Sequence, residues 1–111
     1  MIAVHALQTS RDLKRKSDLQ SISVAMNVLL MESNDDLYAK IPKNATDIGT
    51  AQGLVNLVSY LVPSYIDVMP KDPINGTDAD TKYSIMIDKD NKLVLRATSE
   101  ANPSIPIELI R

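Results

Sequence analysis

The chain contains no cysteine, tryptophan or phenylalanine, and only three of its 111 residues are glycine. Without cysteine, disulfide bonds, zinc–thiolate sites and thiol chemistry are excluded. Three glycines are too few for a glycine-rich phosphate-binding loop. No stretch reaches the roughly 18 apolar residues that cross a bilayer. The net charge of −2 predicts no strong attraction of the whole surface to nucleic acid. What remains is a length that suits one domain, with a core of Leu, Ile, Val and Met.

The strongest local pattern is a helical one over residues 10–34, which contain neither glycine nor proline. Thr9 or Ser10 offers an N-cap oxygen. Apolar residues recur at spacings of 3, 4 and 3: Leu19, Ile22, Met26 and Leu29. This spacing predicts one apolar stripe on a helix that packs against a core. Asn34, Asp35 and Asp36 favour turns, and the two aspartates oppose the dipole of a helix C-terminus, so the helix is expected to end there.

The apolar stripe starts only at Leu19, because the preceding segment is charged. Its charged residues are Arg11, Asp12, Lys14, Arg15, Lys16 and Asp18. We therefore expect the C-terminal half of the helix to pack on the domain and its N-terminal half to project. The apolar start of the chain, residues 1–7, is too short for a secretory signal peptide. It is either an ordinary start or the remainder of a longer apolar segment.

The rest of the chain predicts loops and a small antiparallel sheet. Residues 35–82 form a loop region with one short helix over 47–61, started by Thr46 or Asp47 and ended by Pro63. Residues 83–87 and 92–97 have the composition of strands and flank a turn at 88–91. Pro106 restricts the tail at 105–110 to an edge strand. The predicted fold is α+β: a single domain, 1–111, with a helical spine at 1–34 and a hairpin and tail at 83–111.

Three motifs in this order give the chain a family resemblance. Residues 11–22 read RDLKRKSDLQSI, residues 34–42 carry Asn-Asp-Asp-Leu-Tyr before a proline, and residues 65–73 read YIDVMPKDP ahead of the hairpin that Tyr83 begins. The set resembles the soluble part of type IV pilins and type II secretion pseudopilins. The family's cleavage site, its glutamate and its run of about twenty apolar residues are not in this sequence. The resemblance implies that such a segment lies upstream.

The resemblance also implies a function. A pilin-like domain would be a non-enzymatic structural subunit of a filament used in adhesion, motility or DNA uptake. Its partners would be other pilin subunits and, through the missing helix, the inner membrane. It would be extracellular or periplasmic, and anchored in the cytoplasmic membrane before assembly. The alternatives are a major pseudopilin of a type II secretion system and a soluble ion- or ligand-binding module. An enzyme is the least expected class, since no catalytic constellation is recognisable.

The basic residues of the helix are one candidate site: Arg11, Lys14, Arg15 and Lys16. They can form ion pairs with Asp12 and Asp18 on a solvated helix face, at spacings of three and four residues. With an apolar helix upstream, the same residues would lie where membrane or filament core meets water. The functional interpretation is then an inter-subunit or membrane interface.

The acidic loop before the hairpin is a second candidate. Asp72, Asp78 and Asp80 carry the oxygen ligands that calcium prefers, and the resemblance to pseudopilins implies calcium in this loop. The spacing matches no EF-hand, and turn formation by aspartate explains the same residues without metal. No other cofactor is expected. The methionines are interpreted as core residues: Met26, Met31, Met69 and Met86.

Overall fold

The structure, a computed structural model, describes residues 2–32 and 37–111. It has an α+β fold in which a long N-terminal helix packs against a four-stranded antiparallel sheet, as the sequence predicts. Helix α1 spans Ile2–Glu32, and the short helices α2 and α3 span Leu37–Lys40 and Val58–Leu61. The strands are β1 (Thr46–Asp47), β2 (Ser84–Ile87), β3 (Leu93–Ala97) and β4 (Ile107–Ile110).

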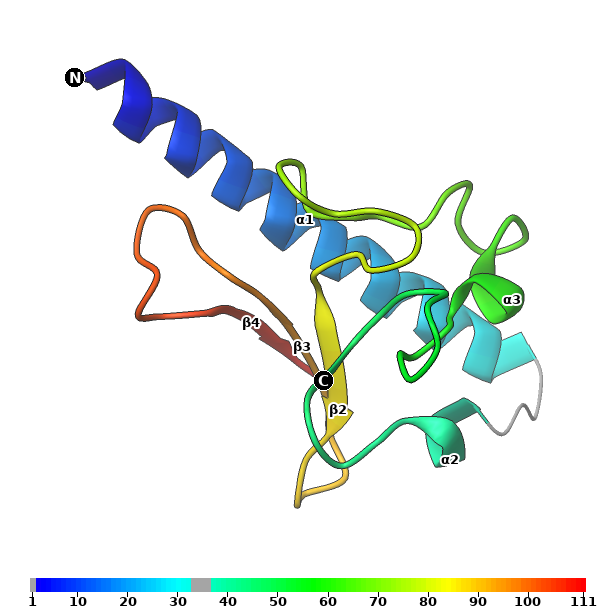
Figure 1. Cartoon of the computed structure of the whole chain (residues 1–111). Coiled ribbons are helices and arrows are strands. Elements are labelled where there is room, and N and C mark those ends of the chain that lie inside the picture. Colours follow the sequence, from blue (N-terminus) through cyan, green and yellow to red (C-terminus); the bar gives the residue numbers. More distant parts are fainter. Residues whose placement is uncertain (1, 33–36) are drawn as a thin grey trace.

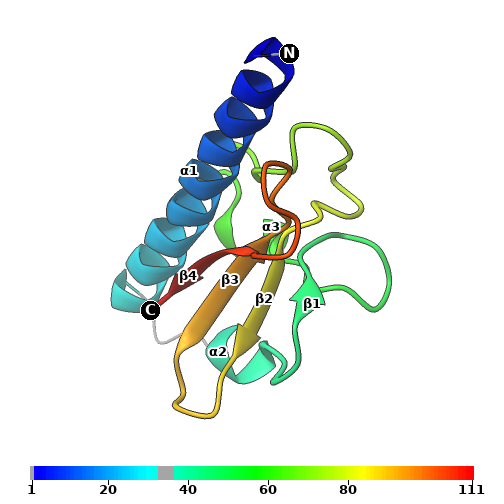
Figure 2. The ribbon, with the colours of Figure 1, turned by 90° about the vertical axis from the view of Figure 1, so that its left-hand side faces the viewer.

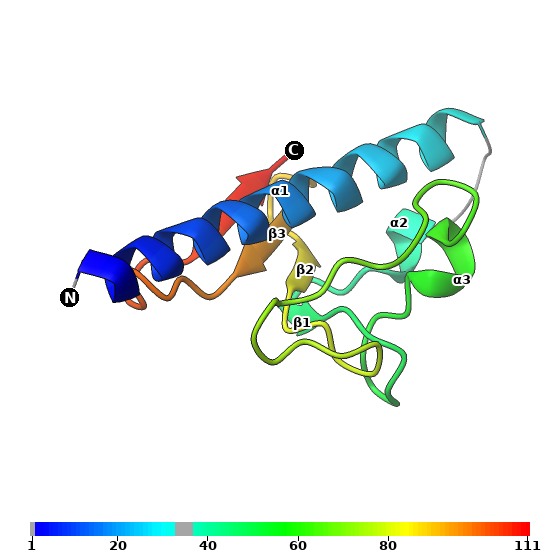
Figure 3. The ribbon, with the colours of Figure 1, turned by 90° about the horizontal axis from the view of Figure 1, so that it is seen from above.

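Helix α1 runs along the length of the molecule, and its first turns extend beyond the sheet and loops (Figures 1 and 3). The expected start at Thr9 or Ser10 is wrong, because the helix already begins at Ile2. No glycine or proline interrupts residues 2–10, and so no local signal stops the helix from extending toward the N-terminus. The expected end at residues 34–36 lies outside the described part of the chain.

The four strands form a meander in the order β1-β2-β3-β4, and Figure 2 shows α1 beside β4. Ile85 pairs with Leu95, and Leu95 pairs with Leu109, so these side chains share the face that turns toward α1. The predicted hairpin is confirmed. Asp88 closes its turn by accepting hydrogen bonds from the backbone N–H groups of Asp90 and Lys92, at 2.8 and 2.9 Å. The predicted edge strand is also confirmed and begins at Ile107, directly after Pro106.

The core lies between α1 and the sheet. Leu19, Ile22, Met26 and Leu29 are at most 5% exposed, which confirms the predicted stripe. Buried residues of the sheet and of the loops complete it: Leu37, Ile41, Ile48, Leu57, Leu61, Met69, Tyr83, Ile85, Ile87, Leu93, Leu95 and Ala97. The prediction of core methionines is confirmed for Met26 and Met69. It is wrong for Met31, which is 78% exposed on the opposite face of α1, and for Met86, which is half-buried and outside the core.

The predicted helix over residues 47–61 is wrong for residues 47–57. Only one turn, α3, is helical, and Thr46 and Asp47 pair with β2 instead of capping a helix. Gly49 is the physical reason. Its N–H bonds to the carbonyl of Val55, and a Cβ at this position would lie 2.1 Å from the carbonyl oxygen of Ala79. Residues 48–51 therefore lie against the loop that precedes β2, and the N–H groups of Thr50 and Ala51 donate to the carbonyls of Asp78 and Ala79. The segment 37–46, predicted as loop, begins with the single turn of α2.

This close approach predicts different costs for two glycine substitutions. Gly49→Ala forces backbone apart and should lower the free energy of unfolding by about 2–3 kcal/mol. Gly53→Ala meets nothing within 4 Å but must hold a φ of +85°, and should cost only about 1 kcal/mol. Urea denaturation of both variants measures the order. A greater loss for Gly53→Ala would contradict the contact between residue 49 and residue 79.

Candidate functional site: an ion-pair network under helix α1

Arg15 is buried between α1 and two loops, with only 2% of its surface exposed. Its guanidinium donates to both carboxylate oxygens of Asp72, with Nε–Oδ2 at 2.8 Å and Nη2–Oδ1 at 3.1 Å. It also donates to Asp12 at 2.8 Å and to Glu100 at 2.7 Å. A two-pronged arginine–carboxylate pair of this kind is among the stronger ionic hydrogen bonds in proteins. One arginine thus joins the helix to the loops before β2 and after β3.

Asp12 fixes the loop after β3 to the helix. Its carboxylate accepts hydrogen bonds from the Ser99 hydroxyl at 2.6 Å and from the backbone N–H groups of Glu100 and Ala101 at 3.0 and 3.2 Å. Arg11 donates through Nε and Nη2 to the two oxygens of Glu100, at 2.6 and 2.7 Å. The charged half of α1 is therefore attached to the domain by hydrogen bonds instead of apolar contacts.

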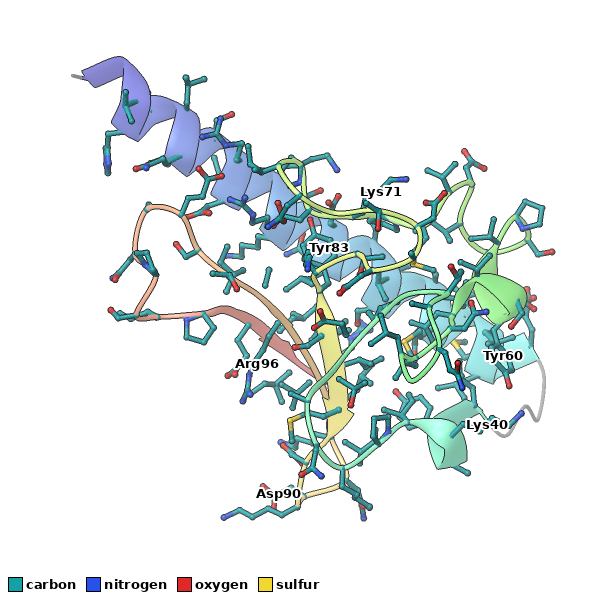
Figure 4. All side chains as sticks on the ribbon, in the orientation of Figure 1. Lys40, Tyr60, Lys71, Tyr83, Asp90 and Arg96 are labelled. Carbon is teal, nitrogen blue, oxygen red and sulfur yellow. The ribbon has the colours of Figure 1, made fainter. Side chains whose placement is uncertain are left out.

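Tyr83 extends the polar contacts under the helix. Its ring is fully buried at the start of β2, beside α1 (Figure 4). Its hydroxyl donates to Asp18 at 2.6 Å, and Asp18 also pairs with Lys14 one turn back. Burial, together with the negative charge of Asp18, raises the pKa of Tyr83. The hydroxyl therefore stays protonated and acts as a donor. We call the residues joined by these contacts the network: Arg11, Asp12, Lys14, Arg15, Asp18, Asp72, Tyr83, Ser99 and Glu100.

The network favours the ionised form of three of its carboxylates, those of Asp12, Asp72 and Glu100. Hydrogen bonds from Arg11 and Arg15 lower the pKa of Glu100 to about 2. Burial opposes the ionisation of Asp12 and Asp72, but their hydrogen bonds outweigh it and lower both pKa values. For a carboxylate whose pKa is depressed on folding, stability is present above the unfolded pKa and is lost as the pH falls through the folded pKa. The network should accordingly hold at neutral pH and weaken only below about pH 4.

These contacts correct the expected role of the basic residues. Projection of the charged half was predicted, but Arg15 is buried and Arg11 is paired with Glu100, so both side chains are used within the chain. Lys14 pairs with Asp18, and Lys16 is exposed. The predicted pairs at spacings of three and four are confirmed by Asp12–Arg15 and Lys14–Asp18. The first turns of α1, before the network, extend past the sheet and loops (Figure 1).

The three aspartates proposed for calcium do not converge. Asp72 is bound to Arg15 and to the backbone N–H groups of Ile74 and Asn75. Asp78 pairs with Lys71 at 2.6 Å, and Asp80 accepts from the backbone N–H of Lys82 at 2.9 Å. Within residues 2–32 and 37–111, no group of three or more acidic or histidine side chains could hold a metal ion. The interpretation as turn-forming residues is confirmed for Asp72 and Asp80, whose carboxylates accept from nearby backbone N–H groups, whereas the Asp78 side chain forms an ion pair with Lys71.

Sequence reasoning missed Ser99, Glu100 and the hydroxyl of Tyr83. One signal was available on the helix itself. Arg11 and Arg15 continue the spacing of the apolar stripe toward the N-terminus, in steps of four residues up to Leu19. Charged residues in line with a buried stripe lie over the domain and need partners there. Their identity has no local signal, because Asp72 and Glu100 lie 57 and 85 residues from Arg15.

A groove of about 440 Å³ opens beside the network. Its lining is polar apart from one isoleucine: Arg15, Asp47, Asp72, Ile74, Asn75, Lys82, Thr98 and Glu100. Lys82 has a left-handed backbone with φ of 69°, held by the bond from its N–H to the Asp80 carboxylate. Burial and a hydrogen bond with Asp80 raise the pKa of Asp47. Asp47, which lines the groove, therefore ionises less readily than the carboxylates of Asp12, Asp72 and Glu100.

The face of α1 that points away from the sheet carries exposed apolar side chains. Leu13 is 64% exposed, Val24 54% and Met31 78%. Val28 lies between the last two and is 36% exposed. At 100° per residue these four lie within a sector of about 60°. We call them the outward face. Asp18 is the only charged residue from 17 to 31, and it turns inward to Tyr83.

No family model, curated protein or solved structure matches this chain. Over the part of the chain that the structure describes, no helix has both the length and the hydrophobicity needed to cross a membrane.

Removal of Arg15 tests the network. Arg15→Met leaves the Asp72 carboxylate buried without its cation and should lower the free energy of unfolding by about 3–5 kcal/mol in urea denaturation. Lys16→Met removes a neighbouring exposed cation and should change it by less than about 0.5 kcal/mol. Similar small effects of both substitutions would mean that the Arg15 contacts do not stabilise the fold.

Ionisation of Asp47 is predicted to lower the stability of the fold, whereas ionisation of Asp12, Asp72 and Glu100 raises it. The pKa of Asp47 is raised by folding, so its ionisation removes stability as the pH rises from its unfolded value through the folded one. Asp47→Asn keeps a donor toward Asp80 without the charge. It should be more stable than the native chain at pH 7 and equal to it near pH 3, as measured by urea denaturation at both values. Asp67→Asn, at an exposed position, is the matched control. A variant that is less stable at pH 7 would refute the effect.

Proposed function

We propose that the protein is a non-enzymatic structural subunit of a type IV pilus-like filament, and that α1 is its assembly element. The observation that carries the proposal is the outward face. A helix on the surface of a monomeric domain presents charged residues to water. On α1, the exposed side between residues 17 and 31 has none, and it places Val24, Val28 and Met31 in solvent. A face of this composition suits packing against other helices.

The projecting end of α1 supports the same proposal. Val4 and Leu7 are 54% and 56% exposed, beyond the last contact between the network and the loops. Burial of apolar side chains at the free end of a helix against other subunits removes them from water and favours association. In the proposed filament, the projecting end and the outward face of α1 lie against neighbouring subunits. The sheet and loops form the head on the other side of the helix.

The network supplies a property that a filament subunit needs. Load on a filament passes from one helix to the next, so the head has to stay fixed to its helix. Arg15 and Asp12 connect α1 to two loops that are distant in sequence. In each of these hydrogen bonds the donor or the acceptor is an ionised side chain, and such bonds are stronger than those between two neutral groups.

The alternatives differ in what supports them. A major pseudopilin of a type II secretion system would share the helix and the sheet. The aspartates of the loop before β2 are engaged by Arg15, Lys71 and Lys82, which favours the pilus subunit over a calcium-dependent pseudopilin. The polar groove favours a ligand-binding module, but that function gives no role to the outward face. The proposed location is an extracellular filament whose subunits are held in the inner membrane before assembly.

Cysteine cross-linking tests the assembly, since the chain has no native cysteine. Val24→Cys and Met31→Cys place thiols on the outward face, with little cost because both positions are exposed. In the native host, mild oxidation should convert either variant into disulfide-linked dimers, because one cysteine per chain can join only two chains. These should be found in the fraction of surface filaments sheared from cells.

Asp90→Cys is the matched control. Asp90 is exposed in the turn between β2 and β3, away from α1 (Figure 4). This variant should form markedly fewer linked species. If the outward-face variants stay monomeric in cells that carry the protein at their surface, the filament proposal fails. If the protein is never recovered in the sheared fraction, it fails as well.

A further inference from the structure

The loop before β2 contains an Asn-Gly step at residues 75 and 76 that the proposed function does not use. The Asn75 side chain is exposed and lines the groove beside the network. In an Asn-Gly step, the absence of a Cβ leaves the following backbone nitrogen open to approach. That nitrogen can attack the asparagine side chain. We propose that Asn75 is a deamidation site, and that the Arg15–Asp72 pair controls its rate.

The reaction needs only water. The backbone nitrogen of Gly76 bonds to Cγ of Asn75, and the bond from Cγ to Nδ2 breaks. Ammonia leaves and carries away the proton of the Gly76 N–H. The product is a five-membered succinimide. Water then opens this ring at either carbonyl, which gives aspartate or isoaspartate at position 75.

The native loop holds the attacking nitrogen away from this reaction. The Gly76 N–H donates to the backbone carbonyl of Asp72 at 3.0 Å. The Asp72 carboxylate accepts from the N–H groups of Ile74 and Asn75, at 2.9 and 3.4 Å. The turn is tightly closed, because a Cβ at position 76 would lie 2.4 Å from the backbone nitrogen of Asp72. The nitrogen can reach Cγ only after these bonds open.

Arg15 determines how readily the turn opens. Its two bonds to Asp72 lie in a buried setting and fix the carboxylate that closes the turn. A local opening of the loop must therefore break a buried ion pair. Deamidation at Asn75 is then slow while the network is intact and becomes faster whenever Arg15 releases Asp72.

The product changes the groove. Aspartate at position 75 adds a negative charge beside Asp72, Asp47 and Glu100, where like charges repel. Isoaspartate also lengthens the backbone between residues 75 and 76, and so it disrupts the 3.0 Å bond to Asp72. Either product weakens the turn that delayed the reaction. A chain modified at Asn75 is therefore one in which the network has opened.

Peptide mapping by mass spectrometry tests the proposal on the purified chain, incubated at mildly alkaline pH with and without denaturing urea. The expected product carries the mass gain of NH2 replaced by OH, located at Asn75. Its formation should be about tenfold or more slower in the folded chain than in urea. Asn44, an exposed loop residue followed by alanine, is the internal comparison and should change far more slowly in urea.

Two substitutions separate the control by Arg15 from simple burial. Arg15→Lys keeps the charge but loses the two-pronged bond, and should raise the rate at Asn75 in the folded chain. Lys16→Met should leave that rate unchanged, and Asn75→Gln should abolish the product. Equal rates in folded and unfolded chain overturn the proposal, whether or not Arg15→Lys folds. A folded Arg15→Lys chain with the native rate overturns the role of Arg15. Neither outcome bears on filament assembly, which cross-linking of the outward face decides.

Discussion

The buried guanidinium of Arg15 is the constraint around which the tertiary contacts of α1's charged half are arranged. A buried guanidinium is tolerated only when its charge is matched and its N–H groups are bonded. Here Asp72, Asp12 and Glu100 provide both, and each belongs to a different part of the chain. The requirement to satisfy one cation thus positions the loop before β2, the loop after β3 and the helix together.

This arrangement divides α1 into parts with different physical roles. From Leu19 onward, apolar burial attaches the helix to the sheet, and such burial is non-directional. Around Arg11 and Arg15, directional ionic bonds attach it to loops. Directional bonds fix the register and rotation of the helix more narrowly than apolar contacts do. The side of α1 that faces outward is therefore also fixed, which matters if that side is an assembly surface.

Local patterns predicted the elements of the fold that depend on local chemistry. The spacing from Leu19 to Leu29 predicted the buried stripe, and the strand-like composition on both sides of the turn at residues 88–91 predicted the hairpin. The predicted helix over residues 47–61 was wrong because the packing of Gly49 on residue 79 holds the first part of this segment outside a helix. The network shows the same limit. Spacing along the helix was enough to predict the pairs Asp12–Arg15 and Lys14–Asp18. The pairing of Arg15 with Asp72 depends on the folded topology of the whole chain.

The use of the basic residues constrains how copies of this chain could associate. Arg11 and Arg15 are neutralised within the chain, and the outward face from residue 17 to 31 has no charge to contribute. Contacts through that face would rest on apolar burial and shape, with little dependence on salt concentration. Apolar contacts do not select a partner by charge, so specificity would have to come from the fixed orientation of the helix. The ion pairs inside the subunit would then act on assembly indirectly, by holding Val24, Val28 and Met31 in one orientation.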